Sequence, residues 1–198
     1  DKVIYAVPGV PHEMREMMEL FILPDIQRRS GETAVIRSRT LRTWGDSESG
    51  LAEKLSDRIE QLDNIGNPTL AFLASGIEGI KVRITAKSKD EASAAQLLTS
   101  EEQFLRDLLG DIVFGIDEET METVVLDLLR RQGMSLAVNE SLTGGVMSAR
   151  LSDIDRNMDT FKGALISTEH LDASIGQDRS LAAARLAKET YGTDVGVA

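Results

Sequence analysis

The chain has no cysteine among its 198 residues. Disulfide bonds, cysteine-ligated zinc sites and thiol nucleophiles are therefore excluded. A chain without disulfides suits a reducing compartment, so a cytoplasmic location is expected. Histidine is scarce as well, with His12 and His170 alone. Few residues are thus available for acid–base or metal chemistry through imidazole groups.

Long apolar runs and positive charge are also lacking. No hydrophobic run approaches the roughly 20 residues that a membrane helix needs, so no membrane partner is expected. The net charge is −11 at neutral pH, whereas proteins that bind nucleic acid through its phosphates usually carry a basic patch. Nucleic acid is therefore disfavoured as a partner. The hydrophobic fraction of 41% still predicts a folded core and argues against disorder.

Breaks in the hydrophobic pattern divide the chain into three regions, which we place at residues 1–29, 33–116 and 117–198. In the first region, a short strand is expected at 2–7. Pro8 and Gly9 then break the chain, and a helix follows that Pro24 is expected to end. A strand, a turn and a helix in this order are typical of the last βα unit of a larger domain.

The middle region shows strand and helix patterns in a compact order. Helices are expected between residues 46 and 62 and between 89 and 109. Strands are expected at four places, namely 34–41, 69–74, 80–86 and 111–116. The order β-α-β-β-α-β predicts a small α+β domain.

The third region predicts α/β structure. Apolar residues between Met121 and Leu129 recur at i, i+3, i+4, i+7 and i+8, which predicts an amphipathic helix. Further elements are expected as strands at 135–138, 161–167 and from 194, and as helices at about 145–151 and 181–190. The whole chain is thus expected to be multidomain and of mixed α/β and α+β class, with an incomplete α/β C-terminal region.

One motif carries candidate chemistry, Asn139-Glu140-Ser141-Leu142-Thr143-Gly144-Gly145. A strand should deliver Ser141 to a tight turn, and the next helix should begin at the glycines. Unpaired N–H groups at that helix start, together with the helix dipole, can hold a phosphate or a developing oxyanion. Ser141 is then a candidate nucleophile if a base lies nearby. A serine or threonine before a helix is more often a plain N-cap, so spacing alone leaves both interpretations open.

Several segments resemble the CinA (competence/damage-inducible protein) family. Residues 118–145 and 161–167 resemble its C-terminal domain. Segments of the middle region resemble its middle domain, namely 39–45, 48–49, 67–71 and 82–86. Residues 7–14 resemble the end of its molybdopterin-binding-like domain. The resemblance follows the family order over nearly the whole chain. It implies that the three regions are the tail of that first domain, a KH-type domain and a truncated C-terminal domain.

The resemblance also implies an activity. The family's C-terminal domain is a nicotinamide-nucleotide amidase that hydrolyses nicotinamide mononucleotide (NMN) to nicotinate mononucleotide and ammonia, a step of pyridine nucleotide salvage. Ser141 matches its nucleophile. We expect the substrate to be bound by Thr143, Gly144, Gly145, Lys162, Ser167 and Thr168, with no cofactor or metal. The complete N-terminal domain implies ADP-ribose as a second substrate and a divalent metal. The implied assembly is a homodimer.

The chain departs from the family pattern after Ser167. The family has a tyrosine there and, five residues later, a lysine that acts as the catalytic base. Thr168 and Ala173 stand at those positions. Two interpretations stay open: the base is lost, or the sequence omits residues at this point. We favour the second, because active-site loops are often mobile. A true loss would favour a non-catalytic nucleotide-binding or interaction module.

The KH-type middle region raises a third hypothesis, nucleic-acid binding. Arg39, Arg42 and Trp44 would form a small basic and aromatic group on its surface. Gly76 and Gly79 have the Gly-x-x-Gly spacing of loops that clamp a nucleic-acid backbone. Because a strand precedes them and an acidic residue lies between them, we favour a hairpin turn.

Overall fold

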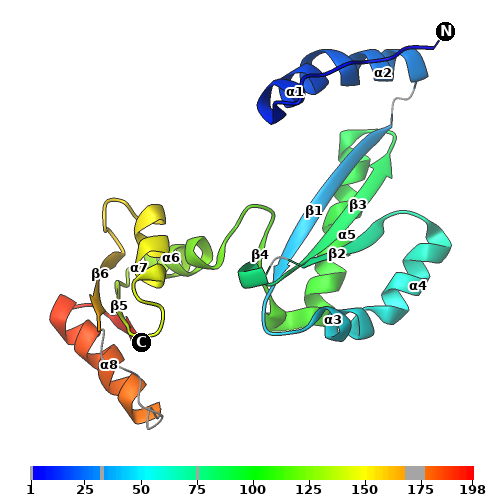
Figure 1. Cartoon of the computed structure of the whole chain (residues 1–198). Coiled ribbons are helices and arrows are strands. Elements are labelled where there is room, and N and C mark those ends of the chain that lie inside the picture. The colour runs from blue at the N-terminus through cyan, green and yellow to red at the C-terminus, as the bar shows by residue number, and fades with distance from the viewer. Residues whose placement is uncertain (1, 32–33, 75, 168–176) are drawn as a thin grey trace. The chain divides into compact units, whose positions relative to one another are not determined.

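The computed structural model describes residues 2–31, 34–74, 76–167 and 177–198, and Figure 1 labels its elements. Two sheets are present with helices, one containing antiparallel strands and the other parallel, so the mixed fold class is confirmed. The chain forms two compact units: residues 1–40, 49–72 and 82–110, and residues 41–48, 73–81 and 111–198. The division into three regions stays a prediction.

The N-terminal part of the chain is helical from position 11 to position 30. Three segments follow one another, namely α1 (Pro11–Met17), a π-helical turn (Met18–Ile22) and α2 (Leu23–Ser30). The expected helix end at Pro24 is wrong. The π-helical turn places Pro24 in the first turn of α2, where its missing N–H leaves no hydrogen bond unmade. The strand expected at 2–7 is wrong too: these residues are not in a strand, and no described strand pairs with them.

The middle of the chain contains a four-stranded sheet in the order β2-β3-β1-β4. Its strands are β1 (Val35–Thr43), β2 (Thr69–Ala74), β3 (Ile80–Ser88) and β4 (Val113–Ile116). The helices here are α3 (Glu48–Lys54), α4 (Ser56–Ile65) and α5 (Glu91–Leu109). The single helix expected between 46 and 62 is wrong, because Leu55 leaves helical geometry and divides it in two.

The core of this part is formed by buried residues that alternate along a strand and recur at helical spacing along a helix. Val82, Ile84 and Ala86 of β3 are buried in alternation, as expected for a strand with one covered face. Asp90 caps the start of helix α5, and its side chain accepts a hydrogen bond from the Ser93 amide at 2.7 Å. Its buried residues recur at helical spacing and are Ala94, Leu98, Glu101, Leu105 and Leu109.

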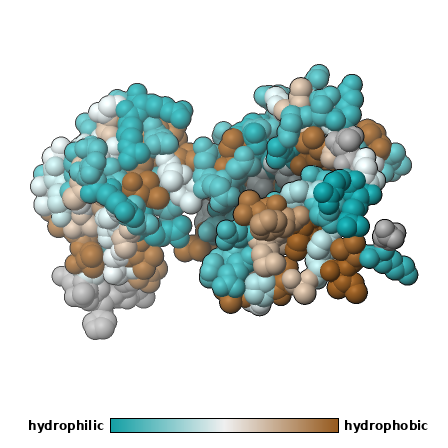
Figure 2. Space-filling model, turned by 90° about the horizontal axis from the view of Figure 1, so that it is seen from above, coloured by the Kyte–Doolittle hydropathy of each residue, from teal (hydrophilic) through white to brown (hydrophobic). Residues whose placement is uncertain are grey.

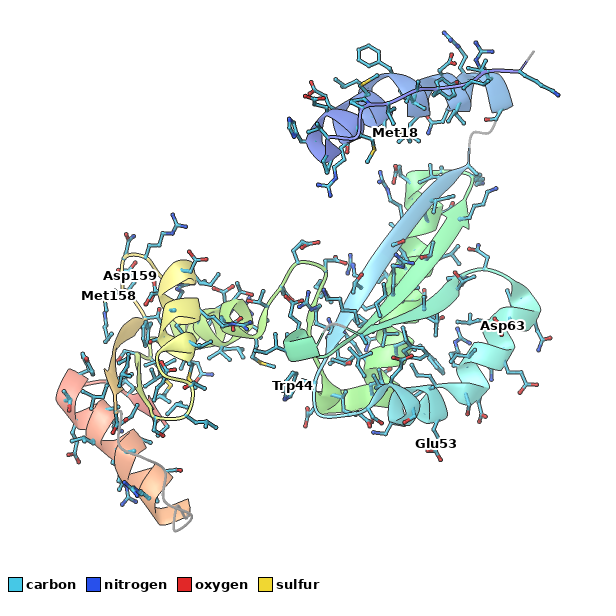
Figure 3. All side chains as sticks on the ribbon, in the orientation of Figure 1. Met18, Trp44, Glu53, Asp63, Met158 and Asp159 are labelled. Atoms are coloured by element: carbon cyan, nitrogen blue, oxygen red, sulfur yellow. The ribbon has the colours of Figure 1, made fainter. Side chains whose placement is uncertain are left out.

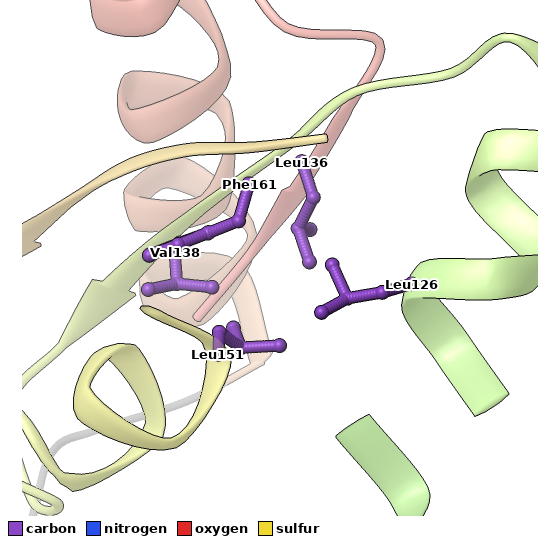
Figure 4. Packing of buried hydrophobic residues seen from close by; sticks show 5 residues of the cluster. All are labelled: Leu126, Leu136, Val138, Leu151 and Phe161. Atoms are coloured by element: carbon purple, nitrogen blue, oxygen red, sulfur yellow. The ribbon is translucent and has the colours of Figure 1, made fainter. Parts of the chain in front are cut away.

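The last part of the chain is a three-stranded parallel sheet in the order β6-β5-β7. Its elements are α6 (Met121–Gln132), β5 (Leu136–Glu140), α7 (Val146–Ile154), β6 (Phe161–Ile166), α8 (Gln177–Tyr191) and β7 (Val195–Val197). The core cluster in Figure 4 joins both helices and strands, with Leu126, Leu136, Val138, Leu151 and Phe161. Parallel strands end at one edge of a sheet, and loops at that edge are where such folds bind ligands.

Polar and hydrophobic residues are both exposed on the surface. Figure 2 shows hydrophilic residues over much of one face, with hydrophobic residues in separate groups between them. None of the helices in the described parts combines the length and the apolar character needed to cross a bilayer.

Candidate functional site

The turn from 141 to 145 joins β5 to α7 and carries Ser141. Ser141 and Leu142 are exposed. Gly144 and Gly145 have φ angles of +58° and +103°, a region that favours glycine over residues with a side chain. The backbone of the turn therefore favours glycine at both positions. Ser141 is presented at the edge of the sheet where the parallel strands end.

The carboxylate of Glu140, which ends β5, binds the far side of this turn. Its Oε2 accepts hydrogen bonds from Thr143 Oγ1 at 2.6 Å, from the Gly145 amide at 3.1 Å and from the Met147 amide at 2.9 Å. Its Oε1 accepts one from the Ser148 amide at 2.7 Å. Glu140 is only 2% exposed. One buried carboxylate thus occupies the start of α7.

These contacts correct the expectation of unpaired N–H groups at the helix start. The first amides of α7 already have an anionic acceptor, and an acidic group is stable there because of the helix dipole. Burial by itself raises the pKa of Glu140. The hydrogen bonds from Thr143, Ser148 and Met147 outweigh it and lower the pKa from 4.5 to about 2. Glu140 is therefore a carboxylate at neutral pH.

Sequence reasoning missed Glu140, although it stands within the motif. A signal was present, since an acidic residue close before a helix start is favourable. It was overlooked because Glu140 lies in the strand, six positions before the first residue of α7, outside the usual capping positions.

Other backbone donors remain in the turn. Among the described residues, no hydrogen-bond acceptor is found for the amides of Leu142, Thr143 and Gly144. They directly follow Ser141 and belong to the same exposed turn. Amides in such a position can stabilise negative charge that develops on a substrate oxygen.

Ser167 lies near this turn. Strands β5 and β6 pair in parallel with Glu140 opposite Ile166, and the Ser167 amide donates to the Glu140 carbonyl at 2.8 Å. A Cβ at Gly145 would lie 3.1 Å from Ile166 Cδ1. The structure therefore brings Ser141, the glycines and Ser167 to one edge of the sheet. Thr168, like Ala173, lies outside the described residues.

Lys162 lies at the other end of the sheet. It is the second residue of β6, next to Phe161, which pairs with Leu136 at the start of β5. It stands four positions before Ile166, which is about 13 Å along a strand. Its Nζ donates to the Met158 carbonyl at 2.9 Å. The structure does not bring Lys162 together with Ser141.

The described residues limit the chemistry of the site. Glu140 is unsuited as a base for Ser141, because four donors occupy its oxygens and its pKa is about 2. Nowhere in the described ranges do three or more metal-ligating side chains gather. These residues do not fit the divalent metal that the resemblance implies for the complete N-terminal domain, and we derive no step through it.

The basic and aromatic group expected in the middle region does not form. Arg39 Nη1 lies 2.5 Å from Glu102, and Arg42, which is buried, lies 3.0 Å from Glu78. Trp44, labelled in Figure 3, follows β1 and is half exposed. Both arginines therefore face a carboxylate, which reduces their attraction for phosphates.

The Gly-x-x-Gly segment connects two strands, as expected. Gly76–Glu78 is a short 3-10 helix between β2 and β3. The interpretation as a turn between strands is confirmed.

Comparison with known proteins agrees with this arrangement. The family model of the damage-inducible protein CinA KH domain matches residues 38–115, and that of the CinA C-terminal domain matches residues 118–171. A CinA-like protein of Frankia casuarinae is 45% identical over 184 residues, 92% of this chain and 42% of that protein. A CinA-like protein of Prochlorococcus marinus is 39% identical, over 83% of this chain and 37% of that protein.

A third relative has a different name. A putative competence-damage inducible protein of Caldicellulosiruptor saccharolyticus is 35% identical over 84% of this chain and 39% of its own length. The chain thus spans about two fifths of these relatives, with 42%, 37% and 39%. Both family models match consecutive parts of the chain, in agreement with the similarity to CinA-like proteins over most of the chain, and the chain belongs to the CinA family.

Proposed function

We propose that the complete protein hydrolyses the carboxamide of NMN and that Ser141 is the nucleophile. The supporting observation is the exposed turn that follows β5. It presents the Ser141 hydroxyl beside the amides of Leu142, Thr143 and Gly144, which have no acceptor among the described residues. A nucleophile next to oriented donors is the arrangement that acyl transfer requires.

The reaction would take place in two steps. Ser141 Oγ attacks the carboxamide carbon, its proton passes to a base, and the carbonyl oxygen becomes an oxyanion near the amides of the turn. The tetrahedral intermediate collapses, and the nitrogen leaves as ammonia after it gains a proton. Water then hydrolyses the ester on Ser141, which releases nicotinate mononucleotide and restores the hydroxyl.

The test is ammonia release from NMN by the complete protein. We expect Ser141→Ala to lower turnover by at least about 1,000-fold, because the attacking oxygen is lost. Ser152→Ala is the matched control: Ser152 lies on α7, is exposed, and donates only to the carbonyl of Ser148 at 2.7 Å. It should leave turnover unchanged. Undiminished ammonia release by Ser141→Ala would refute the assignment of the nucleophile.

A second candidate function is nucleotide binding without hydrolysis. It is favoured by one observation, that Thr168 and Ala173 stand where the family pattern has a tyrosine and a lysine. Calorimetric titration of the complete protein with NMN distinguishes the two. Binding without ammonia release would support the binding module. The ADP-ribose pyrophosphatase activity, its metal and the homodimer stay proposals for the complete protein.

A further inference from the structure

Glu140 contacts three segments near Ser141, two through its side chain and one through its backbone. Its carboxylate accepts from Thr143 within the turn and from Gly145, Met147 and Ser148 at the start of α7. Its backbone carbonyl accepts from Ser167 after β6. Ser141 follows directly in the chain. The carboxylate of the residue before the candidate nucleophile thus holds the turn and the start of α7 at the end of β5.

We infer that Glu140 is a positioning residue for Ser141, and that it leaves the oxyanion to the amides of Leu142, Thr143 and Gly144. Its carboxylate already neutralises the positive end of α7. A substrate phosphate would have to displace a buried side chain to bind there, and it would meet a like charge. The inference rests on the proposed function for its catalytic consequence only.

Buried carboxylates also serve as plain structural caps, and Asp155, which follows α7 and precedes β6, is such a case. Asp155 is buried and accepts from the amides of Thr160 and Phe161, each at 2.7 Å, before β6 begins. Arg130 also binds it at 3.1 Å. Asp155 therefore holds a loop by backbone amides as Glu140 does, but at the opposite end of the strands from Ser141. It provides a matched control.

The experiment compares Glu140→Gln and Asp155→Asn in the complete protein. We expect Glu140→Gln to lower kcat for NMN about 100-fold, because a misplacement of about 1 Å at the reacting atoms has this effect. KM should change less than about threefold, since the phosphate binds elsewhere. Asp155→Asn should lower the melting temperature and leave kcat within about twofold of wild type. If kcat falls equally in both variants, or stays unchanged in Glu140→Gln, the inference is overturned.

Amide hydrogen exchange gives a readout that needs no activity. Glu140→Gln should speed exchange in residues 141–148 at least tenfold and leave 159–161 unchanged, while Asp155→Asn should do the reverse. Unchanged exchange in 141–148 also overturns the inference. If the wild type releases no ammonia, the proposed function fails, and exchange alone decides the role of Glu140. Glu140→Asp, which keeps the charge but not the reach, replaces Glu140→Gln in both assays if the latter does not fold.

Discussion

Glu101 and Glu140 are equally buried, each 2% exposed, but they bind different kinds of donor. Glu101 lies on α5 and takes the guanidinium of Arg58 on α4, with Nε–Oε1 at 3.0 Å and Nη2–Oε2 at 2.5 Å. Glu140 takes one hydroxyl and three backbone amides. The bidentate ion pair of Glu101 joins two helices, whereas Glu140 accepts from amides at a helix start, which have no partner within the helix.

The two glutamates differ in what they stabilise. Glu101 stabilises the packing of two helices, whereas Glu140 stabilises the geometry of the candidate site. Loss of Glu101 leaves a partly buried cation and weakens the contact of two helices, far along the chain from Ser141. Loss of Glu140 frees the turn that carries Ser141. Buried charge in the middle region therefore maintains the fold, and buried charge in the last region also shapes the candidate site. Variants in the middle region test the effect on stability, and variants in the last region test the effect on turnover.

The largest effect on stability is expected from Glu101→Ala. Removal of one partner of a buried ion pair costs about 3 kcal/mol in the free energy of unfolding, which urea denaturation measures. NMN turnover should stay unchanged at temperatures where the variant is folded. The exposed pair of Arg37 and Glu91 offers the control, and Glu91→Ala should cost less than about 1 kcal/mol. Equal costs for the two variants would contradict the comparison.

Gly145→Ala should have the converse effect, on turnover more than on the fold. The new Cβ would lie 3.1 Å from Ile166 Cδ1, at a φ of +103°. We expect a strain of about 1–2 kcal/mol and a loss of about tenfold in kcat through displacement of the turn. Gly144→Ala has a φ of +58° but no heavy atom within 4 Å of the new Cβ, so its effect should be smaller. The reverse order of the two variants would count against close packing of the turn on β6.

A smaller effect concerns acid pH. The folded-state pKa of Glu140, about 2, lies below its ordinary value of 4.5, so the charged form is stabilised by folding. This stabilisation is complete above pH 4.5 and is lost as the pH falls toward 2. The free energy of unfolding should therefore decline less over this window in Glu140→Gln than in wild type. Identical slopes from pH 4.5 to pH 2 would show that Glu140 is not held as a carboxylate.

The smallest effect is expected for Lys162→Ala. Lys162 lies at the opposite end of β6 from Ser141 and donates to the carbonyl of Met158. We expect both kcat and KM for NMN to stay within about twofold of wild type, as is usual for a surface residue away from a site. A rise in KM of tenfold or more would show that Lys162 contacts the substrate and that the phosphate reaches the other end of the sheet.

Local patterns predicted most elements of the fold. Alternation predicted the strands of the middle region, and helical spacing predicted α6, which begins with a capping box of Thr120 and Thr123. The errors arose where distant contacts decide. The strand expected at 2–7 has no described partner, and the helix from 46 to 62 is divided at Leu55, which is fully buried.

The candidate site was predicted in part. The position of Ser141 between a strand and a helix, with glycines after it, follows from residue types alone, because glycine tolerates positive φ. The hydrogen bonding of the amides at the start of α7 did not follow from the residue types. Which acceptor satisfies the amides of Gly145, Met147 and Ser148 depends on where the Glu140 side chain is buried.

The sequence by itself determined that a serine stands in a glycine-containing turn after a strand, since this depends on local backbone preference. Only the tertiary structure decided which residues share the site. The parallel register of β5 and β6 places Ser167 beside Glu140 and places Lys162 at the other end. The physical reason is that strand pairing converts positions in sequence into positions along one axis, and residues four apart on a strand are separated by about 13 Å.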